Sequence, residues 1–268
     1  MKVILVAAIA ILPLSSLFAQ SSFVMVMFDN PTETRLGSFP PDREQYASAI
    51  SVLKEYGAKA IVMKYFLDQN KSALGDNAFA ESLNLLPCFL QAHVDNSEAH
   101  PNPIDVKFSI KIANATNKMI TGNSGWIPLE QFLKNAYDIG FVDMRKADLV
   151  PMFEKYQNSI YKSLWFSILQ YALPSLQVDG KYLSNGSKKA VIDEYGEVSV
   201  RYPCEDKLDY ISFYSIVQRS IDKSSIIGKI ILIGYDGNNI GYLDTPIGKI
   251  KAHRAFYYCL QNLYDQLQ

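Results

Sequence analysis

The sequence contains few cysteines, and this limits the kinds of site that it can form. The three cysteines, Cys88, Cys204 and Cys259, lie too far apart in the chain for a zinc ribbon or a redox pair. An oxidising compartment would allow one disulfide and one leftover thiol, but isolated cysteines in apolar segments more often pack as small hydrophobic side chains. We therefore expect no structural disulfide, and the sequence predicts no metal site and no cofactor.

An excess of charge of either sign is also missing. The 26 lysines and arginines nearly balance the 27 aspartates and glutamates, and no basic tract could follow a phosphate backbone. Nucleic acid is therefore not an expected partner. Beyond the first residues, no stretch reaches the roughly 20 apolar residues of a membrane-spanning helix, so we expect no transmembrane segment in the body of the protein.

Common catalytic signatures are absent from the chain. It has no Gly-x-Ser-x-Gly elbow, no glycine-rich phosphate loop ending in Lys-Ser or Lys-Thr, and no His-Glu-x-x-His pair. The three histidines, His93, His100 and His253, are interpreted as surface or helix-end residues rather than catalytic groups.

The first residues have the three zones of an export signal. Lys2 is followed by an apolar run over residues 3–12, and the small residues Ser15, Ser16 and Ala19 come next. Because the run is too short to span a bilayer, it predicts a cleaved signal peptide over residues 1–19 and a periplasmic or secreted domain over residues 20–268. An uncleaved N-terminal anchor is the alternative.

Apolar strands that alternate with amphipathic helices predict an α/β fold. Residues 22–28 form an apolar run, a helix is expected between Asp42 and Gly57, and residues 58–66 form a second run, as in a parallel βαβ crossover. Asp76 is expected to cap a short helix, and further strands are expected over residues 86–94, 139–142 and 229–235, the last followed by a long loop and a final helix. We predict a mixed, largely parallel central sheet with helices on both faces.

An inserted region interrupts this pattern over residues 95–137, which are rich in Asn, Ser and Pro. Apolar and polar side chains alternate within it over residues 106–112, and this predicts an inserted, half-exposed strand. Residues 152–156 and 160–161 are expected to form an antiparallel pair, and residues 191–195 and 197–202 a hairpin around Gly196.

Several polar residues follow the predicted strands, where parallel sheets bind their ligands. Asp29, Arg43, Lys64 and Asp236 could all face this edge. In the alternative interpretation they are structural: Asp29 caps a turn, Arg43 pairs with a carboxylate, and Lys64 is solvated.

Asp29 also allows a second hypothesis, that of a secreted hydrolase or phosphatase. An aspartate after a buried strand is well placed for nucleophilic attack, as in haloacid-dehalogenase-type phosphatases. That chemistry requires a second aspartate two residues further on, but Pro31 stands there.

Several short motifs follow one another along the chain: Phe28-Asp29, Ser38 to Arg43, Gly57 to Ala60, Asp76 with Ala80, Ile139 to Asp143, Gly228 to Gly234, Asp244-Thr245-Pro246, and His253. Taken in this order, they resemble the type-two CHASE domain, an extracytoplasmic sensory module of bacterial cyclases and kinases. The family commonly has an aspartate where Lys64 stands, which reverses one charge in the expected pocket and suggests a pair between Lys64 and Asp29.

The resemblance implies a non-enzymatic sensory or ligand-binding domain. It implies a ligand-binding or structural set made of Asp29, Arg43, Lys64, Asp76, Asp244 and His253. The expected partners are an unknown small ligand and a membrane-bound kinase or cyclase, since no output domain follows in the sequence. A third hypothesis is a periplasmic adaptor that binds through the edge strand expected over residues 106–112.

Overall fold

A computed structural model describes residues 21–96, 103–112 and 117–268 of the chain. Its centre is a seven-stranded sheet with the order β15-β1-β16-β2-β3-β6, in which β7 also pairs with β3. All of these pairings are parallel except that of β6 with β3. The strands are β1 (Phe23–Phe28), β2 (Ala60–Met63), β3 (Cys88–Val94), β6 (Gly125–Trp126), β7 (Asp138–Phe141), β15 (Ile211–Ser212) and β16 (Ile230–Tyr235).

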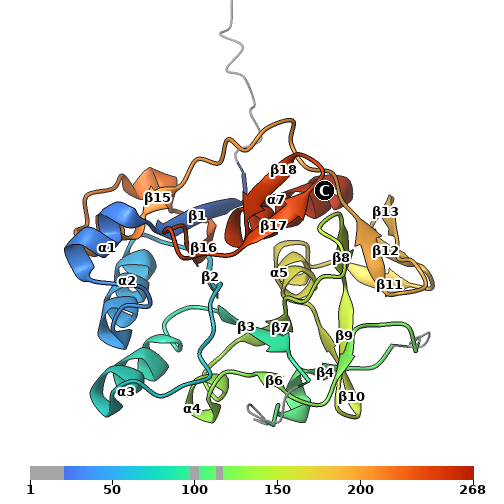
Figure 1. Cartoon of the computed structure of the whole chain (residues 1–268), viewed down its shortest axis with the longest axis horizontal. Helices are drawn as coiled ribbons and strands as arrows, with labels where there is room; N and C mark the ends of the chain where they lie inside the picture. The colour runs from blue at the N-terminus through green and yellow to red at the C-terminus, as the bar shows by residue number, and fades with distance from the viewer. Residues whose placement is uncertain (1–20, 97–102, 113–116) are drawn as a thin grey trace, which may run out of the picture.

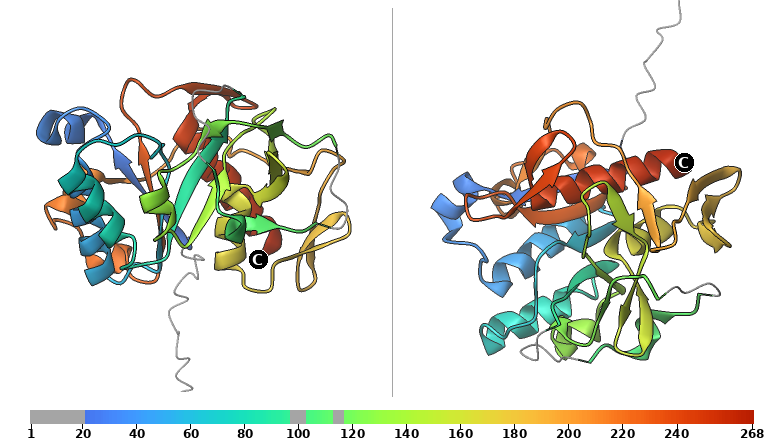
Figure 2. Two further views of the ribbon diagram at one scale, coloured as in Figure 1. Left: turned by 90° about the horizontal axis from the view of Figure 1, so that it is seen from below. Right: turned by 45° about the vertical axis from the view of Figure 1, so that its right-hand side comes forward.

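Both faces of this sheet are covered by helices, as Figures 1 and 2 show. One face packs on α2 (Arg43–Glu55), α3 (Ala73–Ser82), α4 (Glu130–Leu133) and α6 (Phe213–Val217), and the other on α5 (Leu164–Ala172) and α7 (Ala252–Leu267). Every residue of β2 and β16 is buried, because a strand covered on both faces needs apolar side chains throughout. The structure confirms the predicted α/β fold with a mixed, largely parallel sheet.

Most of the remaining strands form small sheets beside α5 and α7, in which every pairing is antiparallel except the parallel one of β5 with β9. One sheet has the order β4-β10-β9-β5 and confirms the pair expected around residue 157, and another has the order β11-β12-β13. These strands are β4 (Ser109–Ile110), β5 (Thr121–Gly122), β9 (Phe153–Tyr156), β10 (Ser159–Lys162), β11 (Gln177–Asp179), β12 (Tyr182–Asn185) and β13 (Lys188–Val191).

Two predictions about local structure are wrong. The expected strand over residues 106–112 begins as a 3₁₀ turn, η1 (Val106–Phe108), and only the two residues of β4 that follow it are extended in a sheet. The hairpin around Gly196 does not form either, since β14 (Glu197–Ser199) pairs with β8 (Leu149–Pro151) and β13 pairs with β12.

Two further expectations near the candidate site need correction. Ser72 rather than Asp76 caps α3, and Asp76 lies in its first turn. The long loop expected after β16 contains a hairpin made of β17 (Tyr242–Thr245) and β18 (Gly248–Lys251). A short helix, α1 (Asn30–Leu36), and a second 3₁₀ turn, η2 (Lys223–Ser225), complete the described elements.

The packing of α5 on β7 is unusually close. A Cβ atom on Gly140 would lie 2.3 Å from the Cα atom of Leu164, so only glycine fits at this position.

In the described part of the chain, no helix is both long and apolar enough to cross a membrane. Cys88, Cys204 and Cys259 are all free thiols.

Candidate functional site

Arg43 and Asp76, two of the candidate residues, form a buried ion pair between α2 and α3. Arg43 Nε lies 3.3 Å from Asp76 Oδ1, and each side chain is only 4% exposed. Arg43 also donates from Nη2 to the Gln69 carbonyl at 3.1 Å, and its guanidinium lies over the rings of Phe79 and Phe132. Because both side chains are buried and the guanidinium is covered by aromatic rings, the ion pair serves to hold α2 and α3 together.

Asp29 is buried directly after β1, where it caps α1. Its Oδ1 accepts hydrogen bonds from the Thr32 backbone N–H at 3.0 Å, from the Thr32 hydroxyl at 2.5 Å and from the Ser212 hydroxyl at 3.0 Å. This is the geometry of a helix N-cap. The suggested pair with Lys64 is not formed, because β16 separates β1 from β2 in the sheet.

Lys64 follows β2 and is only 7% exposed. Its Nζ donates to Gln91 Oε1 at 2.7 Å and lies 5.0 Å from the centre of the Phe256 ring. Among the described residues, no carboxylate forms an ion pair with this amine. Burial therefore lowers the pKa of Lys64 from 10.5 to about 7, and the charge of Asp143 only partly opposes this effect.

His253 lies in the first turn of α7, beside Lys64. Its Nδ1 accepts the Tyr235 backbone N–H at 2.8 Å, so the neutral ring carries its proton on Nε2. Loss of hydration holds the pKa of His253 well below its usual value, and the charge of Lys64 lowers it further. The structure thus brings Lys64 and His253 together from β2 and α7. His100 and the predicted signal peptide lie outside the described residues.

Two acidic residues that the sequence reasoning missed complete this group. Asp143 follows β7, and its carboxylate pairs with His93 Nδ1 at 2.6 Å and accepts the Val94 N–H at 3.0 Å. Glu154 on β9 is fully buried, and its carboxyl group lies against Asp143. Burial, reinforced by the charge of Asp143, raises the pKa of Glu154 well above its usual value.

Asp143 could have been found from the sequence, because it follows a strand as Asp29 does. Glu154 gave no such signal, since it lies inside the strand β9 rather than after a strand. We call Lys64, Gln91, Asp143, Glu154 and His253 the polar cluster.

A surface pocket of about 470 Å³ is lined by residues that follow β7 and by residues of the hairpin after β16, so it lies at the carboxyl ends of the parallel strands. One wall is the loop 144–148, which directly follows Asp143, and the other is the β17–β18 hairpin, which leads into α7. Asp244, the last of the candidate residues, is exposed on this second wall. Neither Asp29 nor the ion pair of Arg43 and Asp76 lines this pocket.

Charged groups of both signs line the pocket. Arg145 and Lys146 lie on one wall together with Asp148, opposite Asp244. Arg145 Nε donates to the buried carboxylate of Glu197 at 2.8 Å, and the negative charge of Glu197 acts in turn on Glu154. The pocket is therefore connected electrostatically to the polar cluster.

Asp236, which follows β16, is fully engaged. Its two oxygens accept from Arg254 Nε and Nη2, both at 2.8 Å, and Lys251 Nζ lies 3.5 Å away. This bidentate pair fixes the start of α7 against the end of β16.

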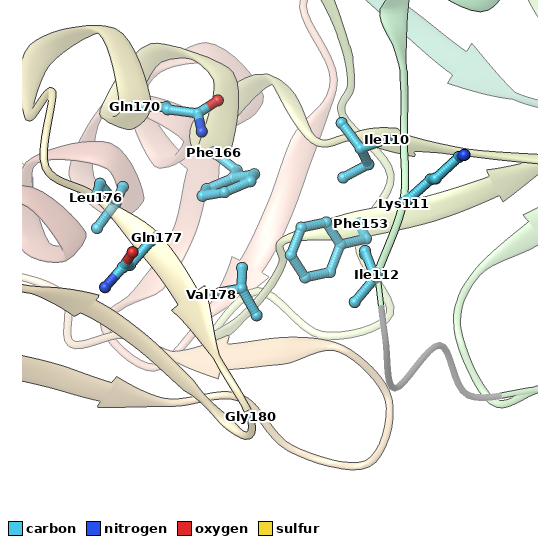
Figure 3. A pocket seen from close by; sticks show the side chains of 10 residues that line it. All are labelled: Ile110, Lys111, Ile112, Phe153, Phe166, Gln170, Leu176, Gln177, Val178 and Gly180. Carbon is cyan, nitrogen blue, oxygen red and sulfur yellow. The ribbon is translucent and has the colours of Figure 1, made fainter.

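A second cavity, of about 400 Å³, lies between α5, β9 and β11 and contains none of the candidate residues (Figure 3). Its floor is apolar, with the rings of Phe153 and Phe166 packed edge to face at 5.2 Å. Strongly perturbed titratable groups gather instead at the polar cluster, so we place the candidate site at the first pocket.

Comparison with known proteins gives one result that covers almost the whole chain. Residues 8–266 match the family model described as CHASE2 domain. No curated protein and no solved structure matches the sequence. Because the match includes nearly every residue, the chain belongs to the CHASE2 family of extracytoplasmic sensory domains.

Proposed function

We propose that this sensory domain is non-enzymatic and binds a small polar ligand in the pocket between the loop 144–148 and the β17–β18 hairpin. The observation that carries the proposal is the attachment of both walls to the polar cluster, one through Asp143 and the other through His253. A ligand that draws the walls together acts on both neighbours of Lys64. A ligand that binds more tightly when the walls are close together shifts the protein toward that state, which is how a sensor responds to its ligand.

The pocket favours a ligand that carries charges of both signs. Its volume lies in the range of small-molecule sites, which is about 300–1,000 Å³. Lys146 offers an ammonium to a carboxylate, and Asp244 offers a carboxylate to an amine. Amino acids and short peptides meet both requirements.

A thermal-shift screen with amino acids, dipeptides and dicarboxylic acids tests this assignment. We expect a bound compound to raise the melting temperature of the wild type and of the control Glu44→Gln, which alters an exposed acid on α2 away from the pocket. The same compound should have little effect on Asp244→Asn. Equal protection of all three proteins would contradict binding at this pocket.

We further propose that the chain is exported through a signal peptide over residues 1–19 and acts on a membrane-bound kinase or cyclase. Family membership supports a location outside the cytoplasm. N-terminal sequencing of the mature protein distinguishes cleavage after Ala19 from a retained anchor.

Cross-linking in intact cells, followed by identification of the captured membrane protein, tests the partner. Capture of soluble proteins alone would contradict it.

A further inference from the structure

Lys64 is in an unusual position for a charged side chain. The amine is nearly inaccessible to water, its only hydrogen-bond acceptor among the described residues is the neutral amide of Gln91, and an aromatic ring closes one side. A buried ammonium without an ion-pair partner is costly, so such a group gains or loses its proton in response to small changes around it.

Two titratable groups face Lys64 from other elements. Asp143, in the loop after β7, favours the protonated form of the Lys64 amine. The positive charge of Lys64 in turn opposes protonation of His253 on α7. Two more titratable groups contact Asp143: His93 on β3 pairs with its carboxylate, and the buried carboxyl group of Glu154 on β9 lies against it. A proton on Lys64 therefore alters the electrostatic balance of the whole cluster.

Each of the two facing groups belongs to one wall of the pocket. Asp143 immediately precedes the loop 144–148, and His253 begins the helix that follows the β17–β18 hairpin. The Asp143 carboxylate is shared between His93 and the Val94 N–H, and a positive charge at Lys64 competes with both. The Nδ1 of His253 holds the end of β16 at Tyr235.

We infer that Lys64 is a proton-binding site through which external pH shifts this domain between two sensory states. Uptake of one proton converts the neutral amine to an ammonium, which draws Asp143 toward it and changes the position of the adjoining loop. The inference rests on the proposed sensory function but needs no ligand in the pocket. Burial places the pKa of Lys64 at about 7, so the change occurs near neutral pH.

The first experiment measures the titration of Lys64 directly. Mature protein labelled with ¹³C at lysine Cε is titrated by NMR, without any added ligand. We expect one lysine signal with a midpoint near pH 7 in the wild type and in the exposed-lysine control Lys54→Met, and its absence in Lys64→Met. Titration of every lysine near pH 10 would overturn the inference while leaving ligand binding at Asp244 untouched.

The second experiment asks whether the proton changes the pocket walls. Hydrogen exchange of residues 144–148 and 242–251 is compared at pH 6 and pH 8, after correction for intrinsic rates. Lys64→Met should show the pH 8 pattern at both values, and Lys64→Arg, which is permanently charged, the pH 6 pattern. If either variant fails to fold, Gln91→Met retains the amine and should move the midpoint of Lys64 to lower pH. A wild type with identical exchange at both values would refute the coupling.

Discussion

Replacement of Lys64 by methionine should change how the stability of the protein depends on pH. Burial lowers the pKa of Lys64 from 10.5 to about 7. Between these two values the unfolded chain holds a proton that the folded protein has released. Unfolding therefore takes up a proton, and the folded state gains stability as the pH rises through this window and loses it as the pH falls.

The size of the effect follows from the same shift. The gain approaches about 1.4 kcal/mol per pH unit once Lys64 is deprotonated and is about half of that at pH 7, which gives about 2 kcal/mol between pH 7 and pH 9. The methionine variant lacks this contribution entirely. Other titrating groups, including the buried cysteines and Glu154, are present in both proteins, so the difference between the two isolates Lys64.

Urea denaturation at pH 7 and pH 9 measures this difference. The free energy of unfolding of the wild type should rise by about 2 kcal/mol more than that of Lys64→Met over this range. Lys54→Met, an exposed substitution on α2, should behave like the wild type. An equal rise in Lys64→Met and the wild type would refute the argument that Lys64 is buried without a countercharge.

Three further predictions concern stability. Arg43→Met should lower the free energy of unfolding by about 3–5 kcal/mol in urea denaturation, because the carboxylate of Asp76 stays buried without its partner, and Asp76→Leu in the same chain should restore much of this loss. The melting temperature of the wild type should fall between pH 7 and pH 5, because His253 takes up a proton in the unfolded chain but stays neutral in the folded protein. His253→Gln should make this fall smaller. Gly140→Ala should destabilise the protein by about 3 kcal/mol through its contact with the backbone of α5, whereas Gly241→Ala, which meets no atom within 4 Å, should cost less than about 1 kcal/mol; similar losses would contradict the close packing.

The central strands could be predicted from sequence because both of their faces are covered. β1, β2 and β16 are nearly continuous apolar runs. Such a run predicts a buried strand from local sequence alone, without knowledge of the strands beside it. Residues 106–112 show the opposite case. The Asp105 carboxylate accepts the Lys107 N–H at 2.9 Å, and this local bond favours a turn over the strand that the alternating pattern predicted.

The candidate site could be predicted only in part, for a related reason. Sequence shows which polar residues follow strands, as for Asp29, Lys64 and Asp236, but the order of strands in space decides which of them meet. β16 lies between β1 and β2, so Lys64 faces Asp143 and His253 instead of Asp29. Glu154 could not be predicted, because it lies inside the short strand β9, where its charged neighbour Lys155 is exposed and only the fold shows that Glu154 is buried.

The position of β16 also affects how the protein folds. β1 and β2 are made early, but the strand that joins them comes roughly 170 residues after β2, and its formation requires contacts of long sequence separation. Until β16 is synthesised, the facing edges of both strands present unpaired N–H and C=O groups to any other chain. Folding should therefore be slow, and aggregation should begin at these edges whenever the C-terminal part of the chain is delayed.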